Sequence, residues 1–359
     1  MIQTDNLNIA SVNELPTPAE IKADHPLTSK AAKTVVAGRS SIESILSRRD
    51  SRLLMIVGPC SIHSLDEAVA YAEKLKALAD EVEERIVIVM RSYFEKPRTI
   101  LGWKGLIYDP ELNGSGNIDL GLRLSRQIML KITELGLPTA TEVLEPIIPQ
   151  YITDLLSWAA IGARTAESQT HRQMASGLSM PIGFKNATDG GMKVAVEAIK
   201  AAASPHTFIG ITSQGVSGIF RTRGNAFGHL VLRGGIHGPN YESEYIAFAR
   251  EMMRKAGLAT NIMIDCSHGN SGKMPSRQIK VMENVVDQRR AGCTDIVGTM
   301  LESNLRSGHQ AIGHDPSALE PGLSVTDACL GWEETEALIR DVFEQLSDPR
   351  RSPPAVRTQ

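Results

Sequence analysis

The chain is poor in aromatic residues and in cysteine, and each scarcity excludes a class of protein. Of its 359 residues only 4% are aromatic and four are cysteine, while 42% are hydrophobic. No two cysteines form a Cys-x-x-Cys pair, which excludes a disulfide framework and a tetrathiolate zinc site. The hydrophobic content is enough for one large core or two ordinary ones. We therefore expect a soluble globular protein.

An excess of one charge and a long apolar run are also missing. The formal net charge is −3, so the chain has no general attraction to nucleic acid or to anionic lipid. No apolar stretch approaches the roughly 18 residues that span a bilayer. The first six residues lack the basic region and apolar core of a secretory signal. These absences predict a cytoplasmic protein with neither nucleic acid nor membrane as a partner.

Short β-branched runs alternate with amphipathic stretches from residue 53 onward, which is typical of a parallel sheet with crossover helices. The pattern predicts strands at 53–57, 86–90, 137–142, 158–163, 180–184, 228–233, 262–266 and 294–299. It predicts helices between them at 65–84, 117–135, 146–156, 167–177, 190–202, 242–256, 275–291 and 332–346. Eight such units favour an α/β fold of the (β/α)8 TIM-barrel type. No Gly-x-Gly-x-x-Gly follows the first strand, which weakens the dinucleotide-binding alternative.

Three segments fall outside this rhythm. Residues 1–50 are polar and proline-containing before a helical stretch at 29–48, so we expect an N-terminal extension with a role in regulation or oligomerisation. Residues 51–346 then form the catalytic barrel. Within it, 207–212 and 216–222 flank Ser-Gln-Gly and predict an inserted β-hairpin at about 207–222. Residues 347–359 are predicted to be a mobile tail.

Metal-ligating residue types follow several of the predicted strands. A cysteine, a histidine and two carboxylates stand at element ends, in the segments 58–63, 262–268, 295–302 and 323–327, and together they indicate one divalent-metal site. The remaining candidates, His63, Cys266 and Cys293, receive no functional role because neighbouring residues already fill it or because they lie in apolar runs. His171 and His206 give no chemical signal.

Cations follow the same strand ends, at Arg91, Lys96, Arg98, Arg164, Lys185 and Arg233. One such residue alone is usually a solvated charge. In a parallel barrel, however, all these ends lie on one rim, so the cations converge on the mouth that holds the metal ligands. Arginine offers fork-shaped donors to phosphate and carboxylate oxygens, and lysine offers a movable charge. So many cations predict two phosphorylated substrates, or a phosphate together with a carboxylate.

Several blocks resemble type I 3-deoxy-D-arabino-heptulosonate 7-phosphate (DAHP) synthases of the aromatic-amino-acid-regulated subgroup. The blocks are GPCSIH (58–63), RSYFEKPRT (91–99), GWKG (102–105), GARTAESQ (162–169), GFKN (183–186), LRGG (232–235), DCSHGN (265–270) and SVTDAC (324–329). The resemblance runs from about residue 5 to 346. It implies the condensation of phosphoenolpyruvate with erythrose 4-phosphate at the entry of the shikimate pathway, with release of phosphate.

The resemblance also assigns residues to roles. It implies Mn²⁺ or Fe²⁺ bound by Cys60, His268, Glu302 and Asp327, and the thiolate also suits Co²⁺, Zn²⁺ or Cu²⁺. Phosphoenolpyruvate is expected at Arg91, Lys96, Ala163, Arg164, Lys185 and Arg233. Erythrose 4-phosphate is expected at Lys96, Pro97, Arg98 and Thr99. The predicted catalytic residues are Lys96, Lys185, Glu142 and Cys60, with Glu142 and Lys185 handling the protons of the attacking water.

Members of this subgroup are commonly inhibited by an aromatic amino acid bound between subunits, which implies a homo-oligomer, either a dimer or a tetramer. The corresponding site takes Asp5, Asn6 and Leu7 from one subunit and Pro149, Gln150, Ser179, Phe208, Gly210 and Phe220 from another. In the family, glycine at the position of Gly210 leaves room for a para hydroxyl. The resemblance therefore favours Tyr as effector, ahead of Trp and Phe.

Three alternatives stay open at this point. A 3-deoxy-D-manno-octulosonate 8-phosphate synthase would use arabinose 5-phosphate instead, although the block at 96–99 favours the four-carbon sugar. A barrel without catalysis could serve as an aromatic amino acid sensor, which the intact ligand set disfavours. A metallohydrolase would not need so many phosphate-binding cations. Independently, the spacing of Asp327 and Cys329 predicts that Cys329 lies near Cys60, where oxidation with copper would join the two thiols.

Overall fold

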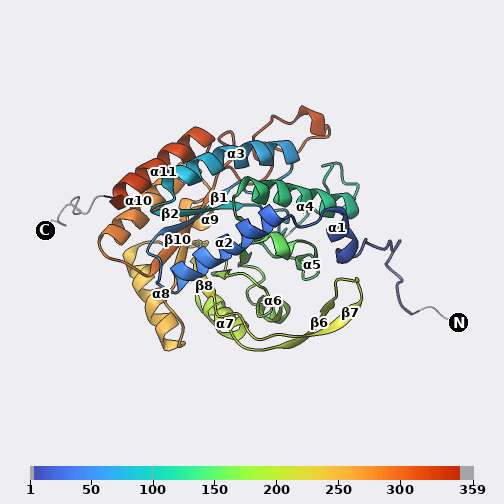
Figure 1. Ribbon diagram of the computed structural model, residues 1–359, viewed down its shortest axis with the longest axis horizontal. Helices are drawn as coiled ribbons and strands as arrows, with labels where there is room; N and C mark the ends of the chain where they lie inside the picture. The colour runs from blue at the N-terminus through green and yellow to red at the C-terminus, as the bar shows by residue number, and fades with distance from the viewer. Residues whose placement is uncertain (1–3, 99, 348–359) are drawn as a thin grey trace.

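Eight parallel strands close into a barrel, in the order β1-β10-β9-β8-β5-β4-β3-β2 (Figure 1). The computed structural model describes residues 4–98 and 100–347. The barrel strands are β1 (Leu53–Gly58), β2 (Ile86–Arg91), β3 (Thr139–Glu142), β4 (Trp158–Ile161), β5 (Ile182–Lys185), β8 (Gly228–Leu232), β9 (Ile262–Asp265) and β10 (Ile296–Glu302). Both faces of these strands are covered, which is why they are almost continuously apolar. The predicted (β/α)8 barrel is confirmed.

Helices cover the outside of the barrel, and several begin at a side-chain cap. For example, the Ser64 side chain accepts a hydrogen bond from the Glu67 amide at the start of α3. None of the described helices is long and apolar enough to cross a membrane. The helices are α1 (Pro18–Asp24), α2 (Ser29–Leu46), α3 (Leu65–Val82), α4 (Ile118–Leu135), α5 (Pro149–Ile152), α6 (Gln169–Ala175), α7 (Lys193–Ala202), α8 (Ser243–Lys255), α9 (His268–Ser271), α10 (Arg277–Arg290) and α11 (Trp332–Ser347).

Three helical segments differ from the sequence-based expectation. Helix α1 lies in the stretch expected to be only polar and proline-containing, because Thr17 and Glu20 form a capping box around Pro18 at the first helical position. The helix expected at 146–156 is divided into α5 and a 3₁₀ turn, Thr153–Leu155. The one-turn helix α9 was not predicted, since four residues carry no periodic signal. Thr99 and all but one residue of the predicted tail lie outside the described residues.

Helix α2 closes the amino-terminal end of the barrel. Its residues Ile42, Ile45 and Leu46 belong to the same buried cluster as the inward-facing side chains of the strands. In that cluster the Trp158 indole donates a hydrogen bond of 3.1 Å to Nε2 of the buried His229. Figure 1 shows α2 crossing the barrel. The N-terminal segment therefore contributes directly to the barrel core.

The predicted hairpin is present as a separate two-stranded antiparallel sheet, β6 (Thr207–Ile211) and β7 (Ser217–Arg221). It is inserted between α7 and β8 and lies outside the ring of barrel strands (Figure 1). Phe208 and Phe220 pair across it with stacked rings, 5.6 Å between centroids. The Ala19 amide donates a 2.8 Å hydrogen bond to the carbonyl of Ser213 at the hairpin tip. This bond joins the N-terminal extension to the insertion.

Candidate active site

Charged side chains end the inward-facing rows of the barrel strands. Residues alternate between the two faces of a strand, and the interior row includes Val89, Ala140, Val231, Met263 and Met300. Two residues further along each of these strands, at its carboxyl end, the residues are Arg91, Glu142, Arg233, Asp265 and Glu302. Lys185 follows Gly183 in the same way on β5. The charged side chains therefore all lie at the carboxyl end of the barrel, which we call the mouth.

Three of the four predicted metal ligands lie together. The ligating atoms of Cys60, Glu302 and Asp327 all lie within 4.8 Å of one another. The fourth, His268, has its Nε2 atom 3.9 Å from the Glu302 carboxylate. Cys60 and Glu302 are buried, whereas Asp327 is partly exposed. The cluster combines one soft thiolate with an imidazole and two carboxylates, a donor set that suits a transition-metal ion.

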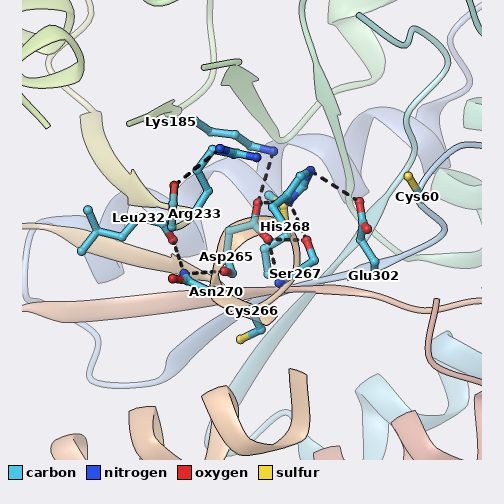
Figure 2. A network of polar contacts seen from close by, with 12 residues as sticks. Cys60, Lys185, Leu232, Arg233, Asp265, Cys266, Ser267, His268, Asn270 and Glu302 are labelled. Atoms are coloured by element: carbon cyan, nitrogen blue, oxygen red, sulfur yellow. Dashed lines mark hydrogen bonds and ion pairs between the residues drawn. The ribbon is translucent and has the colours of Figure 1, made fainter. Parts of the chain in front are cut away.

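The side chains of Asp265 and Ser267 orient the imidazole of His268 (Figure 2). Its Nδ1 atom lies 3.0 Å from the Asp265 carboxylate and 2.7 Å from the Ser267 hydroxyl. These contacts leave Nε2 facing Glu302, as in metal sites where a carboxylate fixes the tautomer of a ligating histidine. Burial alone would raise the pKa of Asp265, but His268 and Lys185 hold it well below its usual range. Asp265 thus positions the proposed ligand, a role that the sequence interpretation did not assign.

Arg91 and Lys96 bring positive charge to the edge of the cluster. The buried Arg91 guanidinium lies 2.8 Å from the Glu302 carboxylate and donates to the carbonyls of Pro59 and Cys60. The Lys96 ammonium lies 3.1 Å from the Cys60 sulfur. Burial opposes the charge on Lys96, but Cys60 and Glu302 outweigh it and raise the pKa of the ammonium. Both cations are therefore protonated and compensate the negative ligand set.

Lys185 lies between two carboxylates at the centre of the mouth. Its ammonium is 3.7 Å from Glu142 and 3.4 Å from Asp265, and all three side chains are buried. Burial would lower the pKa of Lys185, yet Tyr93, Asp265 and Glu142 raise it overall. Lys185 and Glu142 form one ion-paired unit that can hold and release a proton beside the cavity.

A cavity of about 140 Å³ opens above these groups, and it gathers most of the predicted substrate residues. Arg164 reaches it from a loop, because β4 ends at Ile161 and not at residue 163 as predicted. Cys60 and Glu302 lie at the ligand cluster but not in the lining, and Thr99 is outside the described residues. Lys273 lines the cavity 3.3 Å from Asp327 and was not predicted. The lining residues are Arg91, Lys96, Pro97, Arg98, Glu142, Ala163, Arg164, Lys185, Arg233, His268, Lys273 and Asp327.

Three buried asparagines tie the ends of β5, β8 and β9 together. The Asn186 side-chain oxygen accepts a 2.7 Å hydrogen bond from the Arg233 amide and a 3.3 Å bond from the Asn240 side chain. Asn240 accepts a 2.7 Å bond from the Gly234 amide, and its own amide donates to Asn270 at 2.8 Å. Asn270 in turn donates to carbonyls at the ends of β8 and β9 (Figure 2). The network fixes the backbone that presents Arg233.

A glycine contact lets these two strand ends approach closely. Gly234 has φ +71°, and a Cβ atom built on it would lie 2.4 Å from the carbonyl carbon of Gly269. The Gly269 amide donates to the Arg233 carbonyl at 3.0 Å. Only glycine allows backbone segments to meet this closely. The contact places Arg233 and His268 on adjoining segments.

A second, larger cavity of about 370 Å³ lies against the hairpin. Five predicted effector residues line it, namely Pro149, Gln150, Phe208, Gly210 and Phe220. Ser179 and the segment Asp5–Leu7 are not among the described residues lining it in this single chain. The resemblance expects that segment to come from another subunit. Arg221 and Arg223 also line the cavity and were not predicted.

Comparisons with known proteins cover nearly the whole chain. The family model of the DAHP synthetase I family matches residues 24–340. The Tyr-sensitive phospho-2-dehydro-3-deoxyheptonate aldolase of Escherichia coli (strain K12) is 49% identical over 343 residues, 96% of this chain and 96% of that protein. The Trp-sensitive protein of the same strain is 49% identical over 340 residues, 94% of this chain and 97% of that protein.

Structural similarity agrees with the sequence matches. The solved structure of phospho-2-dehydro-3-deoxyheptonate aldolase from Francisella tularensis SCHU S4 is similar with a TM-score of 0.93 and 46% sequence identity. The similarity covers 96% of this chain and 100% of that chain. The family model, the relatives and the solved structure each match most of the chain. The chain belongs to the DAHP synthetase I family of carbon–carbon bond-forming enzymes.

Proposed function

We propose that this chain condenses phosphoenolpyruvate with D-erythrose 4-phosphate and water to give DAHP and phosphate, the first step of the shikimate pathway. The main support is the cavity at the barrel mouth, where Arg91, Lys96, Arg164, Lys185 and Arg233 surround one site. Two phosphorylated substrates need this many cations, and family membership indicates the same chemistry. We propose the role of each individual residue on the same basis.

The residues at the mouth fit a divalent metal ion. The thiolate and two carboxylates of the cluster converge within 4.8 Å, and His268 lies beside them with its ring oriented by Asp265. We assign Cys60, His268, Glu302 and Asp327 as the ligands. The thiolate favours Fe²⁺ and later transition metals, and the carboxylates keep Mn²⁺ acceptable. When bound, the ion would supply Lewis acidity beside the aldehyde of the sugar phosphate.

The cations of the cavity bind and orient the first substrate. Arg164 and Arg233 offer forked donors to the phosphate and carboxylate of phosphoenolpyruvate, and Lys185 neutralises charge between them. Ala163 lines the same wall. The four-carbon sugar phosphate then lies over Lys96 and Pro97, with Arg98 at its phosphate. Holding both substrates in this geometry brings C3 of phosphoenolpyruvate to the aldehyde carbon.

Lys96 and the Glu142–Lys185 pair handle the charges that develop. As C3 bonds to the aldehyde carbon, negative charge grows on the aldehyde oxygen, and the Lys96 ammonium stabilises it. Water adds at C2 and gives its proton to Glu142, whose carboxylate lies 3.7 Å from Lys185. The hydroxyl left on C2 then gives its proton to the departing phosphate and becomes the C2 carbonyl, while phosphate takes the C–O bonding electrons. The protonated Lys185 compensates the charge of this leaving group. The alkoxide formed from the aldehyde takes up the other proton of the water and becomes a hydroxyl of the product.

We further propose that the cavity beside the hairpin binds an aromatic amino acid that inhibits the reaction, with Tyr favoured. A Cβ atom added at Gly210 would lie 3.1 Å from the Phe220 ring, so glycine there keeps the cavity wide. Isothermal titration with Tyr, Trp and Phe separates the three. We expect Gly210→Ser to weaken the response to Tyr more than the response to Phe.

A phosphoenolpyruvate-consumption assay tests the proposed reaction. The full chain is assayed with erythrose 4-phosphate after metal is stripped, and again after Mn²⁺ or Fe²⁺ is restored. We expect turnover only with metal and an equal release of phosphate. Cys60→Ala and His268→Ala should lose metal and turnover while keeping the fold. Full activity of both variants, or of the stripped protein, would refute the assigned ligand set.

A further inference from the structure

A third cavity, of about 200 Å³, lies at the opposite end of the barrel from the proposed active site. It is formed where the end of α2 and the end of α10 meet the beginnings of β1 and β10. Val297 lines it on β10, five residues before Glu302, which separates the two sites by about 16 Å along the strand. The lining residues are Ile45, Arg48, Asp50, Ser51, Arg289, Cys293, Thr294 and Val297.

The first notable group in this cavity is the guanidinium of Arg289. It is held by two neutral acceptors, the carbonyls of Ile296 at 2.6 Å and Ser51 at 2.8 Å. Among the described residues it forms no ion pair with a carboxylate. The last turn of α10 favours a cation but supplies no full negative charge. Burial lowers the pKa of Arg289, and the charge of Arg48 lowers it further.

Arg48 is the second guanidinium, and its backbone is strained. It adopts a left-handed conformation, φ 59°, directly after α2, where glycine is usual. Its side chain donates to the Thr294 carbonyl and, at 3.0 Å, to the Thr260 carbonyl. These bonds hold a second positive charge at the same cavity. Such a conformation persists where surrounding contacts hold the residue, as the two carbonyl contacts do here.

The nearby carboxylates are engaged by other groups. Asp295 is 3.9 Å from Arg48 but 3.3 Å from Arg250, and it also accepts a 2.6 Å hydrogen bond from the Thr260 hydroxyl. Asp50 is bound by Arg52 through two nitrogens, at 2.9 and 2.7 Å. Arg48 thus shares Asp295 with Arg250, while among the described residues Arg289 has no carboxylate partner, so positive charge remains where Arg48 and Arg289 line the cavity. Arg289 is partly buried, and a charge held away from water without an anion is costly.

We propose that this cavity binds a small oxyanion of the phosphate or sulfate class, held between Arg48 and Arg289. Guanidinium forks match the oxygens of such anions, and each fork still has N–H groups beyond those bonded to carbonyls. The hydroxyl-bearing residues Ser51 and Thr294 line the same space. The site is formed by residues separate from the proposed catalytic groups, so it stands independently of the proposed reaction.

Cys293 offers a local readout, because it lines the cavity and is the partly exposed cysteine among four free ones. The full chain is labelled with N-ethylmaleimide, which is uncharged, in the presence of phosphoenolpyruvate to occupy the active site. The labelling rate of the Cys293 peptide is followed by mass spectrometry. We expect inorganic phosphate and sulfate to slow it severalfold, while chloride at equal ionic strength does not.

Substitutions of Arg48 distinguish the site from general screening. Arg48→Gln should raise the phosphate concentration for half protection about tenfold, and Arg48→Lys less, since it keeps the charge but loses the fork. Arg49→Gln is the matched control, because Arg49 does not line the cavity. Circular dichroism checks that each variant is folded. Equal protection by chloride and phosphate, or equal effects of Arg48→Gln and Arg49→Gln, would overturn the proposal.

Discussion

The Lys96 ammonium lies 3.1 Å from the Cys60 sulfur and 3.2 Å from the Cys60 carbonyl oxygen. The lysine therefore touches the one soft ligand of the proposed metal cluster and also lines the substrate cavity. The ammonium therefore compensates negative charge at the proposed ligand cluster. It is equally placed to stabilise an oxyanion that develops above the cluster. This single contact links ligand chemistry to substrate chemistry.

Replacing Lys96 with methionine should lower kcat by about 100- to 1000-fold, the usual cost of losing one group that stabilises developing charge. Phosphate release measures the loss. Lys104→Met is the control, because Lys104 belongs to the same loop and its backbone carbonyl accepts from the Lys96 amide. Similar rates for both variants would remove Lys96 from the proposed mechanism.

Asn240→Ala should raise KM for phosphoenolpyruvate about tenfold, since it frees the Gly234 amide and the loop that presents Arg233. Asn225→Ala is the matched control. Asn225 is also buried and donates to two carbonyls, Leu178 at 3.1 Å and Met180 at 2.9 Å, but at the other end of the barrel.

We expect Asn225→Ala to lose about 1–3 kcal/mol of unfolding free energy with KM unchanged. Steady-state kinetics and denaturant unfolding on both variants separate the two effects. If Asn240→Ala lowered stability alone, with KM as in the unsubstituted chain, the asparagine network would be purely structural.

His229 should make the protein less stable as pH falls from about 6.5 to about 4. Burial lowers the pKa of His229 to about 4 from its ordinary value of 6.5. The unfolded chain therefore binds a proton in this window that the folded chain does not, so stability present above the unfolded pKa is lost on acidification. The ring is fully buried, and its Nε2 accepts from the Trp158 indole, while the contact of Nδ1 with the Phe227 carbonyl opposes the lowering without outweighing burial.

Glutamine at position 229 retains an acceptor for Trp158 but cannot be protonated in this range. Urea unfolding at several pH values should show a smaller pH dependence for His229→Gln, by at most about 3 kcal/mol across the window. Burial lowers the pKa of His63 to about 4 as well. Because His63 is present in both the unsubstituted chain and His229→Gln, its contribution cancels in the comparison. Parallel stability curves would contradict the prediction.

Oxidation with Cu²⁺ and O₂ should join Cys60 to Cys329 and abolish turnover. The Cys60 amide lies 3.4 Å from the Cys329 sulfur, and both thiols are free and buried. Mass spectrometry should find the linked peptides, and dithiothreitol should restore activity. Cys329→Ala should resist inactivation, whereas Cys266→Ala, which removes a different buried thiol, should stay sensitive.

The barrel could be predicted because its strands are buried on both faces and so appear as separate apolar runs. The ends of β2 and β5 were predictable because a charged residue, Arg91 or Lys185, follows a run of apolar residues. Helix α1 was missed because its start depends on one capping box around Pro18. The carboxyl end of β4 was set two residues too late, since Gly162 and Ala163 continue the apolar composition although the ladder has ended.

Candidate site residues could be identified where a reactive residue type follows a strand, as for Cys60 and His268, and their roles stay predictions. Lys273 and Asp265 escaped for different reasons. Lys273 follows a one-turn helix that has no periodic signal, and Asp265 lies inside the predicted strand 262–266 and received no role of its own. The cavity between Arg48 and Arg289 joins segments 241 residues apart, and arginines at helix ends are too common to mark a site.

Helix α2 covers the amino end of the barrel with Ile42, Ile45 and Leu46, and buried side chains fill the barrel interior above it, so the described residues leave no path through the barrel to the proposed active site. Substrates and products therefore enter and leave through the same opening at the barrel mouth. A phosphate ion that is still bound there blocks the binding of the next phosphoenolpyruvate. Inorganic phosphate should accordingly act as a competitive product inhibitor towards that substrate.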